Sequence, residues 1–116
     1  MQATPFGSWK RIEFNSRDIL YIVEDGFKCD THFIDGETVT LQWGDMENLL
    51  NKLPKVFCYK HNCVVYINPN EMNSYLSNGS FVTVKFRNGM QLKKLSVVDF
   101  ERNVIPKLNR EHEREF

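Results

Sequence analysis

The sequence has no excess of either charge, few cysteines and no long apolar stretch. Its 15 lysines and arginines balance its 15 aspartates and glutamates, whereas nucleic-acid binders usually carry a basic excess because phosphate neutralisation supplies most of their affinity. The balance is compatible with a basic face only if an acidic face opposes it. No apolar run approaches the ~20 residues that a membrane span needs, and the first ten residues lack the apolar segment of a secretory signal. We therefore expect a soluble, cytoplasmic protein with no membrane partner.

The chain has three cysteines, Cys29, Cys58 and Cys63. An odd number without a secretory signal indicates reduced thiols. Cys58 and Cys63, with His61 between them, resemble half of a zinc site, but a structural site needs a second pair of ligands. The remaining candidates, Cys29, His32 and His112, are too scattered along the sequence to supply that pair. We expect no metal and no cofactor.

Motifs typical of catalysis are missing from the sequence. It contains no nucleophile elbow, no phosphate-binding glycine loop and no zinc-protease helix motif. His61 and Cys63 would share one face of a strand, but a nucleophilic cysteine also needs a third group that orients its base. We expect that the protein is not an enzyme.

Short strands dominate the pattern of the sequence, whose 116 residues suit one domain. Residues 19–24 form a nearly continuous apolar run, which is typical of a strand buried on both faces. The pairs Asp25-Gly26, Asp35-Gly36, Asn78-Gly79 and Asn88-Gly89 predict tight turns. We expect strands at 9–14, 19–24, 27–34, 38–43, 64–67, 72–76, 81–86 and 90–95, and an irregular connection at 57–62.

Two helices complete a predicted α+β fold that is mostly β, with compact antiparallel hairpins. The first covers 45–53, with Asp45 as its cap and Pro54 at its end, and its apolar positions are Met46, Leu49, Leu50 and Leu53. Ser96 caps a short second helix that contains Phe100 and Ile105 and reaches Pro106. We expect an N-terminal extension at 1–9, one domain at 10–108 and a charged tail at 109–116 that frays.

Three groups of polar residues are candidates for contact with nucleic acid. They are Lys60, His61 and Asn62 before a strand, Lys93 and Lys94 in the last hairpin, and Arg102 in the last helix. An asparagine side chain can read adenine with two hydrogen bonds, and lysine can reach phosphates or guanine. Taken alone, however, a cluster of charges more often only solvates a face.

The order of several motifs adds to this interpretation. The segments are Asp18-Ile19-Leu20-Tyr21-Ile22 with Glu24 and Gly26, then 44–49, then Phe57-Cys58-Tyr59-Lys60-His61-Asn62-Cys63, then Asn68-Pro69, then Asn88-Gly89 before 95–97, and finally Phe100. In this order they resemble the LytTR DNA-binding domains of bacterial response regulators, over about residues 12 to 108. The resemblance implies a compact β fold whose loops enter successive major grooves of DNA.

The resemblance also implies a function and a set of site residues. The chain would bind duplex DNA sequence-specifically, at direct repeats in promoters, as a bacterial transcriptional regulator in a two-component system. Asn62 and His61 would face the bases, and Lys60, Lys93, Lys94 and Arg102 would contact phosphates. The domain would act alone or beside a receiver domain or histidine kinase, as a monomer or weak dimer.

Three positions depart from the family pattern and support an alternative. Val98 and Tyr59 stand where the family has arginines, and Cys63 stands where it has a serine. The arginine replaced by Val98 is a base-reading candidate in the family. Together with the zero net charge, this favours a LytTR-like domain that has lost specific DNA binding and acts through a protein partner.

Overall fold

A computed structural model describes residues 1–59 and 62–108. The predictions for Lys60, His61 and the tail at 109–116 therefore lie outside the described residues. No helix within the described ranges is long and apolar enough to cross a membrane.

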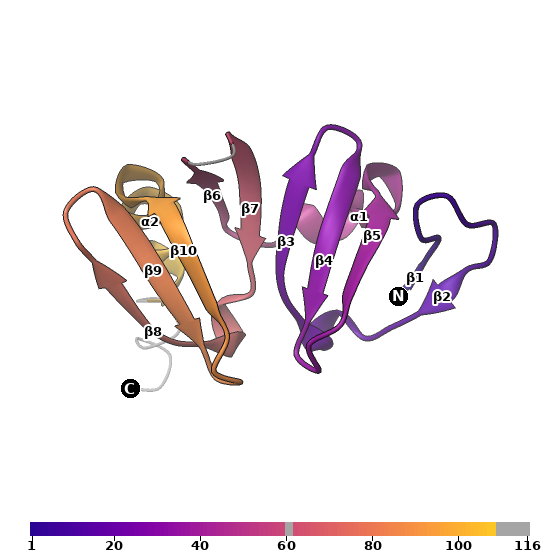
Figure 1. Cartoon of the computed structure of the whole chain (residues 1–116), viewed down its shortest axis with the longest axis horizontal. Coiled ribbons are helices and arrows are strands. Elements are labelled where there is room, and N and C mark those ends of the chain that lie inside the picture. The colour runs from indigo at the N-terminus through magenta and orange to yellow at the C-terminus, as the bar shows by residue number, and fades with distance from the viewer. Residues whose placement is uncertain (60–61, 109–116) are drawn as a thin grey trace.

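Eight strands form one antiparallel sheet in the order β5-β4-β3-β7-β6-β10-β9-β8, and two short strands, β1 and β2, pair separately (Figure 1). The elements are β1 (Gln2–Ala3), β2 (Ile12–Glu13), β3 (Ile19–Asp25), β4 (Lys28–Phe33), β5 (Thr38–Gln42), α1 (Trp43–Leu50), β6 (Lys55–Cys58), β7 (Cys63–Ile67), β8 (Met72–Ser77), β9 (Phe81–Phe86), β10 (Gln91–Ser96) and α2 (Val97–Asn103). Short 3-10 turns at Ser16–Asp18 and Pro69–Glu71 precede β3 and β8. The predicted α+β class, mostly β, is confirmed.

The local sequence explains most of these elements. The first four residues of β3 are all buried, as the apolar run predicts. Gly79 and Gly89 follow asparagines in the two C-terminal hairpins and have φ angles of 95° and 92°. An L residue with a side chain rarely adopts such angles, so glycine fixes both turns and with them the strand register.

Helix α1 differs from its predicted bounds. It begins at Trp43 rather than at 45 and ends at Leu50 rather than at 53. Asp45 does not cap it, because the residue lies inside the first turn, where its carboxylate accepts a hydrogen bond from the Thr4 main-chain N–H at 3.1 Å. Met46 and Leu50 are buried as predicted, whereas Leu49 and Leu53 are only partly buried at the edge of the core.

Two strand predictions also change. The segment predicted to be irregular begins inside strand β6, where Val56 and Cys58 point inward and Lys55 and Phe57 are exposed. Four alternating residues are too few for the pattern to distinguish a strand from a loop. The predicted strand at 9–14 shrinks to β2, whereas the Ser96 cap of α2 is confirmed, since its hydroxyl accepts a hydrogen bond from the N–H of Asp99 at 3.4 Å.

The sheet curls around a central cluster of apolar side chains. Strands β3 and β9 are separated by three strands, which in a flat sheet would place them ~19 Å apart. Yet the rings of Tyr21 on β3 and Phe86 on β9 stack with centroids 5.5 Å apart. The buried members of the central cluster are Leu20, Tyr21, Val56, Cys58, Val65, Ile67, Met72, Val82, Val84, Phe86, Leu95, Phe100 and Val104.

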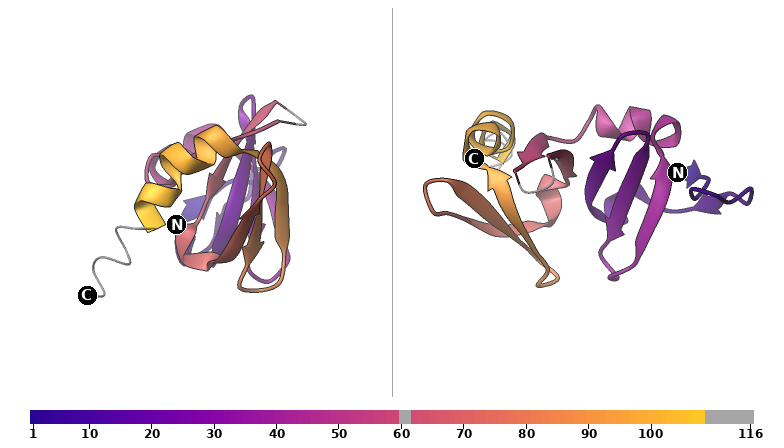
Figure 2. Two further views of the ribbon diagram at one scale, coloured as in Figure 1. Left: turned by 90° about the vertical axis from the view of Figure 1, so that its left-hand side faces the viewer. Right: turned by 45° about the horizontal axis from the view of Figure 1, so that its top comes forward.

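A second, lateral cluster lies on the other face of β3 and β7. Val23 pairs with Val65 while Ile22 pairs with Tyr66, and successive strand residues point to opposite faces. The lateral cluster consists of Ala3, Ile19, Ile22, Cys29, Phe33, Leu41, Met46, Leu50 and Tyr66. Thus α1 covers one face and α2 the other, although the curl leaves both helices on the same side of the molecule (Figure 2).

The first six residues pack against the edge strand β5. Ala3 is fully buried in the lateral cluster, Pro5 forms an isolated bridge with Leu41, and the Phe6 N–H donates to the carbonyl of Thr40 at 2.7 Å.

Candidate nucleic-acid interface

The end of β6 meets the end of β10, at the upper ends of these strands in Figure 1. Leu95 on β10 pairs with Cys58 on β6, and the N–H of Tyr59 donates to the carbonyl of Lys94 at 3.2 Å. The Tyr59 ring also lies 5.2 Å from that of Phe81 at the start of β9. Two segments that lie more than 30 residues apart in the sequence therefore form one surface.

Lys94 occupies a bulge in β10. Leu92 pairs with Val84 and Leu95 with Val82, so two residues of β10 oppose only Thr83 of β9. Lys94 has a φ angle of 63°, in the left-handed region that costs a residue with a side chain roughly 1–2 kcal/mol. Bulges re-aim side chains at functional edges, and here both Lys93 and Lys94 are exposed.

Asn62 also adopts the left-handed conformation. Its φ angle is 51° and its side chain is exposed just before β7. Asparagine tolerates this conformation better than other residues with side chains, because its short amide bonds locally. The turn geometry therefore gives Asn62 a structural role besides any role in base reading.

Helix α2 carries the other candidate residues away from the turn. Val98 lies in its first turn with 58% of its surface exposed. Arg102 is exposed in the last turn, one helical turn or ~6 Å further along the axis than Val98. Asp99 and Glu101 lie on the same helix, so Arg102 does not belong to a purely basic surface.

Tyr59 is a residue of this surface that the sequence analysis did not assign to the site. It is 71% exposed although its ring rests on Phe81. Its position follows from the alternation in β6, where Val56 and Cys58 point inward and their neighbours point outward. Recognising β6 as a strand would have placed Tyr59 beside the predicted polar residues.

Two of the three cysteines lie at the base of the same turn. Cys58 and Cys63 are direct partners across β6 and β7, and all three thiols are free. Burial, with a smaller contribution from the neighbouring Cys58, raises the pKa of Cys63 to about 11. Burial likewise raises the pKa of Cys29, on β4, to about 12. Within residues 1–59 and 62–108, no group of three or more potential ligands is placed to hold a metal ion.

This architecture is that of a small α+β domain in which two helices pack on a curled antiparallel sheet. A solved LytTr DNA-binding domain from Bacillus cereus superposes with a TM-score of 0.58 over 88% of this chain and 93% of that one, at 16% sequence identity. No protein-family model and no curated protein sequence matches the chain. The chain therefore has the fold of a LytTR domain, which confirms the fold that the sequence motifs implied.

Proposed function

We propose that this domain binds duplex DNA through the surface formed by the β6–β7 turn, the bulge of β10 and the exposed side of α2. Asn62, with His61, would face the base edges, and Lys60, Lys93, Lys94 and Arg102 would contact phosphates. The LytTr DNA-binding domain that shares the fold supports this assignment. The proposed setting is transcriptional regulation in a bacterial cytoplasm, at promoter direct repeats, with a receiver domain or histidine kinase as upstream partner and the domain a monomer or weak dimer.

One observation carries the proposal. In the described part of the chain, the only two residues other than glycine with positive φ angles are Asn62 and Lys94. Both belong to the set of polar residues that the sequence predicted to contact DNA. Lys94 accepts the hydrogen bond from Tyr59, and Asn62 lies nearby because Cys58 and Cys63, the neighbours of Tyr59 and Asn62, pair with each other. Backbone strain of this kind concentrates at functional sites, where it aims particular side chains.

The experiment that tests the proposal measures binding to promoter duplexes at several salt concentrations by fluorescence anisotropy. A phosphate-binding surface predicts a straight decline of log K with log salt, with a slope of about −0.9 per phosphate contact. Failure to bind any duplex below ~100 μM, the weak end of non-specific affinity, would contradict it.

Base reading by Asn62 is tested with glycine rather than alanine. Glycine keeps the left-handed turn and removes only the amide, whereas alanine would strain the backbone. If Asn62 reads a base, Asn62→Gly weakens specific binding by about 1–3 kcal/mol and relaxes preference at one base pair. If Asn62 serves only the turn, Asn62→Gly binds like the wild type.

The alternative function is a LytTR-like domain that acts through a protein partner. Val98, an exposed apolar residue at the start of α2, and the zero net charge favour it. It predicts no salt-dependent DNA binding at all, which the same anisotropy series distinguishes.

A further inference from the structure

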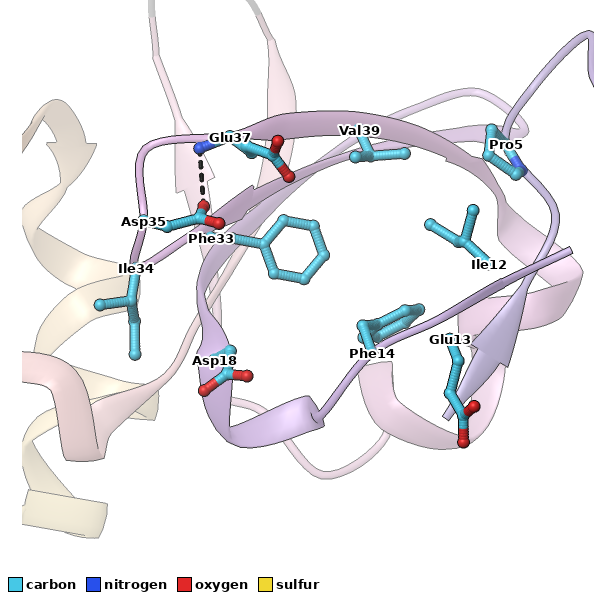
Figure 3. Close-up of a pocket in the computed structure, with 10 residues that line it drawn as sticks. All are labelled: Pro5, Ile12, Glu13, Phe14, Asp18, Phe33, Ile34, Asp35, Glu37 and Val39. Carbon is cyan, nitrogen blue, oxygen red and sulfur yellow. Dashed lines mark hydrogen bonds between the residues drawn. The ribbon is translucent and has the colours of Figure 1, made fainter.

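A cavity of about 640 Å³ opens at the other end of β3, between β2 and the turn that joins β4 to β5 (Figure 3). Its volume lies within the ~300–1,000 Å³ typical of ligand pockets. The five residue steps along β3 from Ile19 to Glu24 correspond to ~17 Å, so the cavity is well separated from the candidate DNA surface.

The floor of the cavity is apolar and well packed. Phe14 and Phe33 meet edge to face with ring centroids 5.5 Å apart, and Ile12 and Val39 lie beside them (Figure 3). Phe33 belongs to the buried lateral cluster, and Ile12, Phe14 and Val39 pack against that cluster, so the floor is continuous with the core and offers an apolar side chain a packed apolar surface.

The rim of the cavity is acidic. Asp18 lies on one side of Phe33 and Asp35 and Glu37 lie on the other (Figure 3), with Glu13 beyond Phe14. The ten lining residues include these four carboxylates and no lysine, arginine or histidine. An anionic ligand would be repelled here, whereas a cation would gain several weak attractions at once.

One side-chain and two main-chain hydrogen bonds hold the rim in place. The Oδ1 of Asp35 accepts from the N–H of Glu37 at 2.9 Å, and the carbonyl of Asp18 accepts from the N–H of Ile34 at 2.8 Å. The N–H of Phe33 donates to the carbonyl of Glu37 at 2.9 Å. Asp35 and Glu37 are therefore carried on a hydrogen-bonded turn, and Asp18, in the 3-10 turn before β3, is joined to it through Ile34. This order reduces the entropy lost when a ligand binds.

We propose that this cavity binds a segment of a partner protein in which an apolar side chain is flanked by lysines or arginines. The apolar side chain would pack on Phe14 and Phe33, and the flanking cations would pair with Asp18, Asp35 and Glu37. Charge complementarity selects this occupant over a nucleic acid or an acidic segment. The site is distinct from the DNA surface and adds a second binding function.

The test uses the whole chain and a blocked five-residue peptide in which lysine and leucine alternate. Two control peptides carry glutamate in place of lysine or serine in place of leucine. We expect the basic peptide to shift the amide resonances of Phe33, Asp35, Glu37 and Val39 in NMR titrations at low salt. Neither control peptide should shift them at the same concentrations.

Charge-removing variants complete the test. The triple variant Asp18→Asn, Asp35→Asn, Glu37→Gln keeps the shapes and the Asp35 acceptor, and should weaken peptide binding about tenfold, or about twofold per exposed carboxylate. Glu47→Gln, an exposed position on α1, is the matched control and should bind like the wild type. Unchanged affinity in the triple variant, equal binding of either control peptide, or resonance shifts elsewhere would overturn the proposal. Because no DNA is present, the outcome is independent of DNA binding.

Discussion

The main-chain N–H of Tyr59 donates a hydrogen bond to the main-chain carbonyl of Lys94 at 3.2 Å. This bond joins the turn after β6 to the bulge of β10, so a change on one segment is transmitted to the other. Substitutions in this surface must therefore preserve its backbone if they are to report on side-chain function.

Lys94 allows stability and DNA binding to be separated. Lys94→Gly relieves the left-handed strain and should raise the free energy of unfolding by up to about 1 kcal/mol. The same change removes a cation, so it should weaken DNA binding evenly across sequences and reduce the salt slope by about one unit. Chemical denaturation and anisotropy measure the two effects. Lys94→Arg, which keeps the charge, is the control and should bind DNA like the wild type. Wild-type DNA affinity in the Lys94→Gly variant would instead show that Lys94 does not contact DNA.

Val98→Arg should strengthen DNA binding. The position is exposed in the first turn of α2, and a cation there would add about one unit to the salt slope. A cation near a helix N-terminus costs about 0.3–1 kcal/mol of stability, which thermal unfolding would detect. Val98→Gln separates charge from length. A Val98→Arg variant whose affinity matches that of Val98→Gln would speak against phosphates near α2.

Leu50→Ala tests the packing of α1 on the sheet. Leu50 is 4% exposed in the lateral cluster, so its truncation should cost about 2–5 kcal/mol in chemical denaturation. Leu49, only partly buried on the same helix, is the comparison, and Leu49→Ala should cost clearly less. Equal losses at the two positions would mean that the helix is oriented differently.

The thiols should react slowly in the folded protein. Raising the pKa of Cys63 from 9.0 to about 11 lowers its thiolate fraction about 100-fold at pH 8. Higher intrinsic nucleophilicity recovers about tenfold, which leaves alkylation by iodoacetamide about tenfold slower than in the unfolded chain. Mass spectrometry over time at pH 8, with and without urea, measures this difference. The rate should rise with pH until about pH 11, and fully buried Cys29 should react more slowly still.

The free energy of unfolding should decrease as the pH is lowered and His32 becomes protonated. Burial lowers the pKa of His32 below its ordinary 6.5, against a smaller opposing effect of Asp30. The folded protein therefore binds this proton less readily than the unfolded chain does. The stability associated with neutral His32 is complete above pH 6.5 and is lost as the pH falls toward the folded-state pKa.

The control for this pH effect is His32→Phe, which retains an aromatic ring against Tyr21, where the two rings now stack at 4.2 Å. The difference in melting temperature between about pH 7.5 and pH 5.5 should be smaller in the variant than in the wild type. Equal differences would assign the pH dependence to other groups.

The sequence predicted those parts of the fold that are encoded locally. Gly79 and Gly89 set their hairpins because glycine alone adopts those φ angles easily, and Ser96 caps α2 through its own hydroxyl. Asp45 misled because its carboxylate bonds to Thr4, 41 residues away in the sequence. The stacking of Tyr21 on Phe86 depends on the curl of the whole sheet, which no short pattern encodes.

The same distinction applies to the candidate site. Motif order selected Asn62, and its charge in the last hairpin selected Lys94, whereas their shared left-handed backbone became visible only in three dimensions. The acidic cavity was not predicted, because Pro5, Asp18 and Asp35 come from three separate segments of the chain.

The attachment of the first six residues to β5 has a consequence for solubility. β5 is the outermost strand of the sheet, and an unpaired outermost strand is a template for pairing with another molecule. The bridge of Pro5 to Leu41 and the bond from Phe6 to Thr40 occupy part of that edge. Since proline has no N–H to offer, it cannot extend the ladder further. This N-terminal segment therefore covers part of an edge that could otherwise pair with another molecule, and the edge lies at the end of the strand order opposite β8.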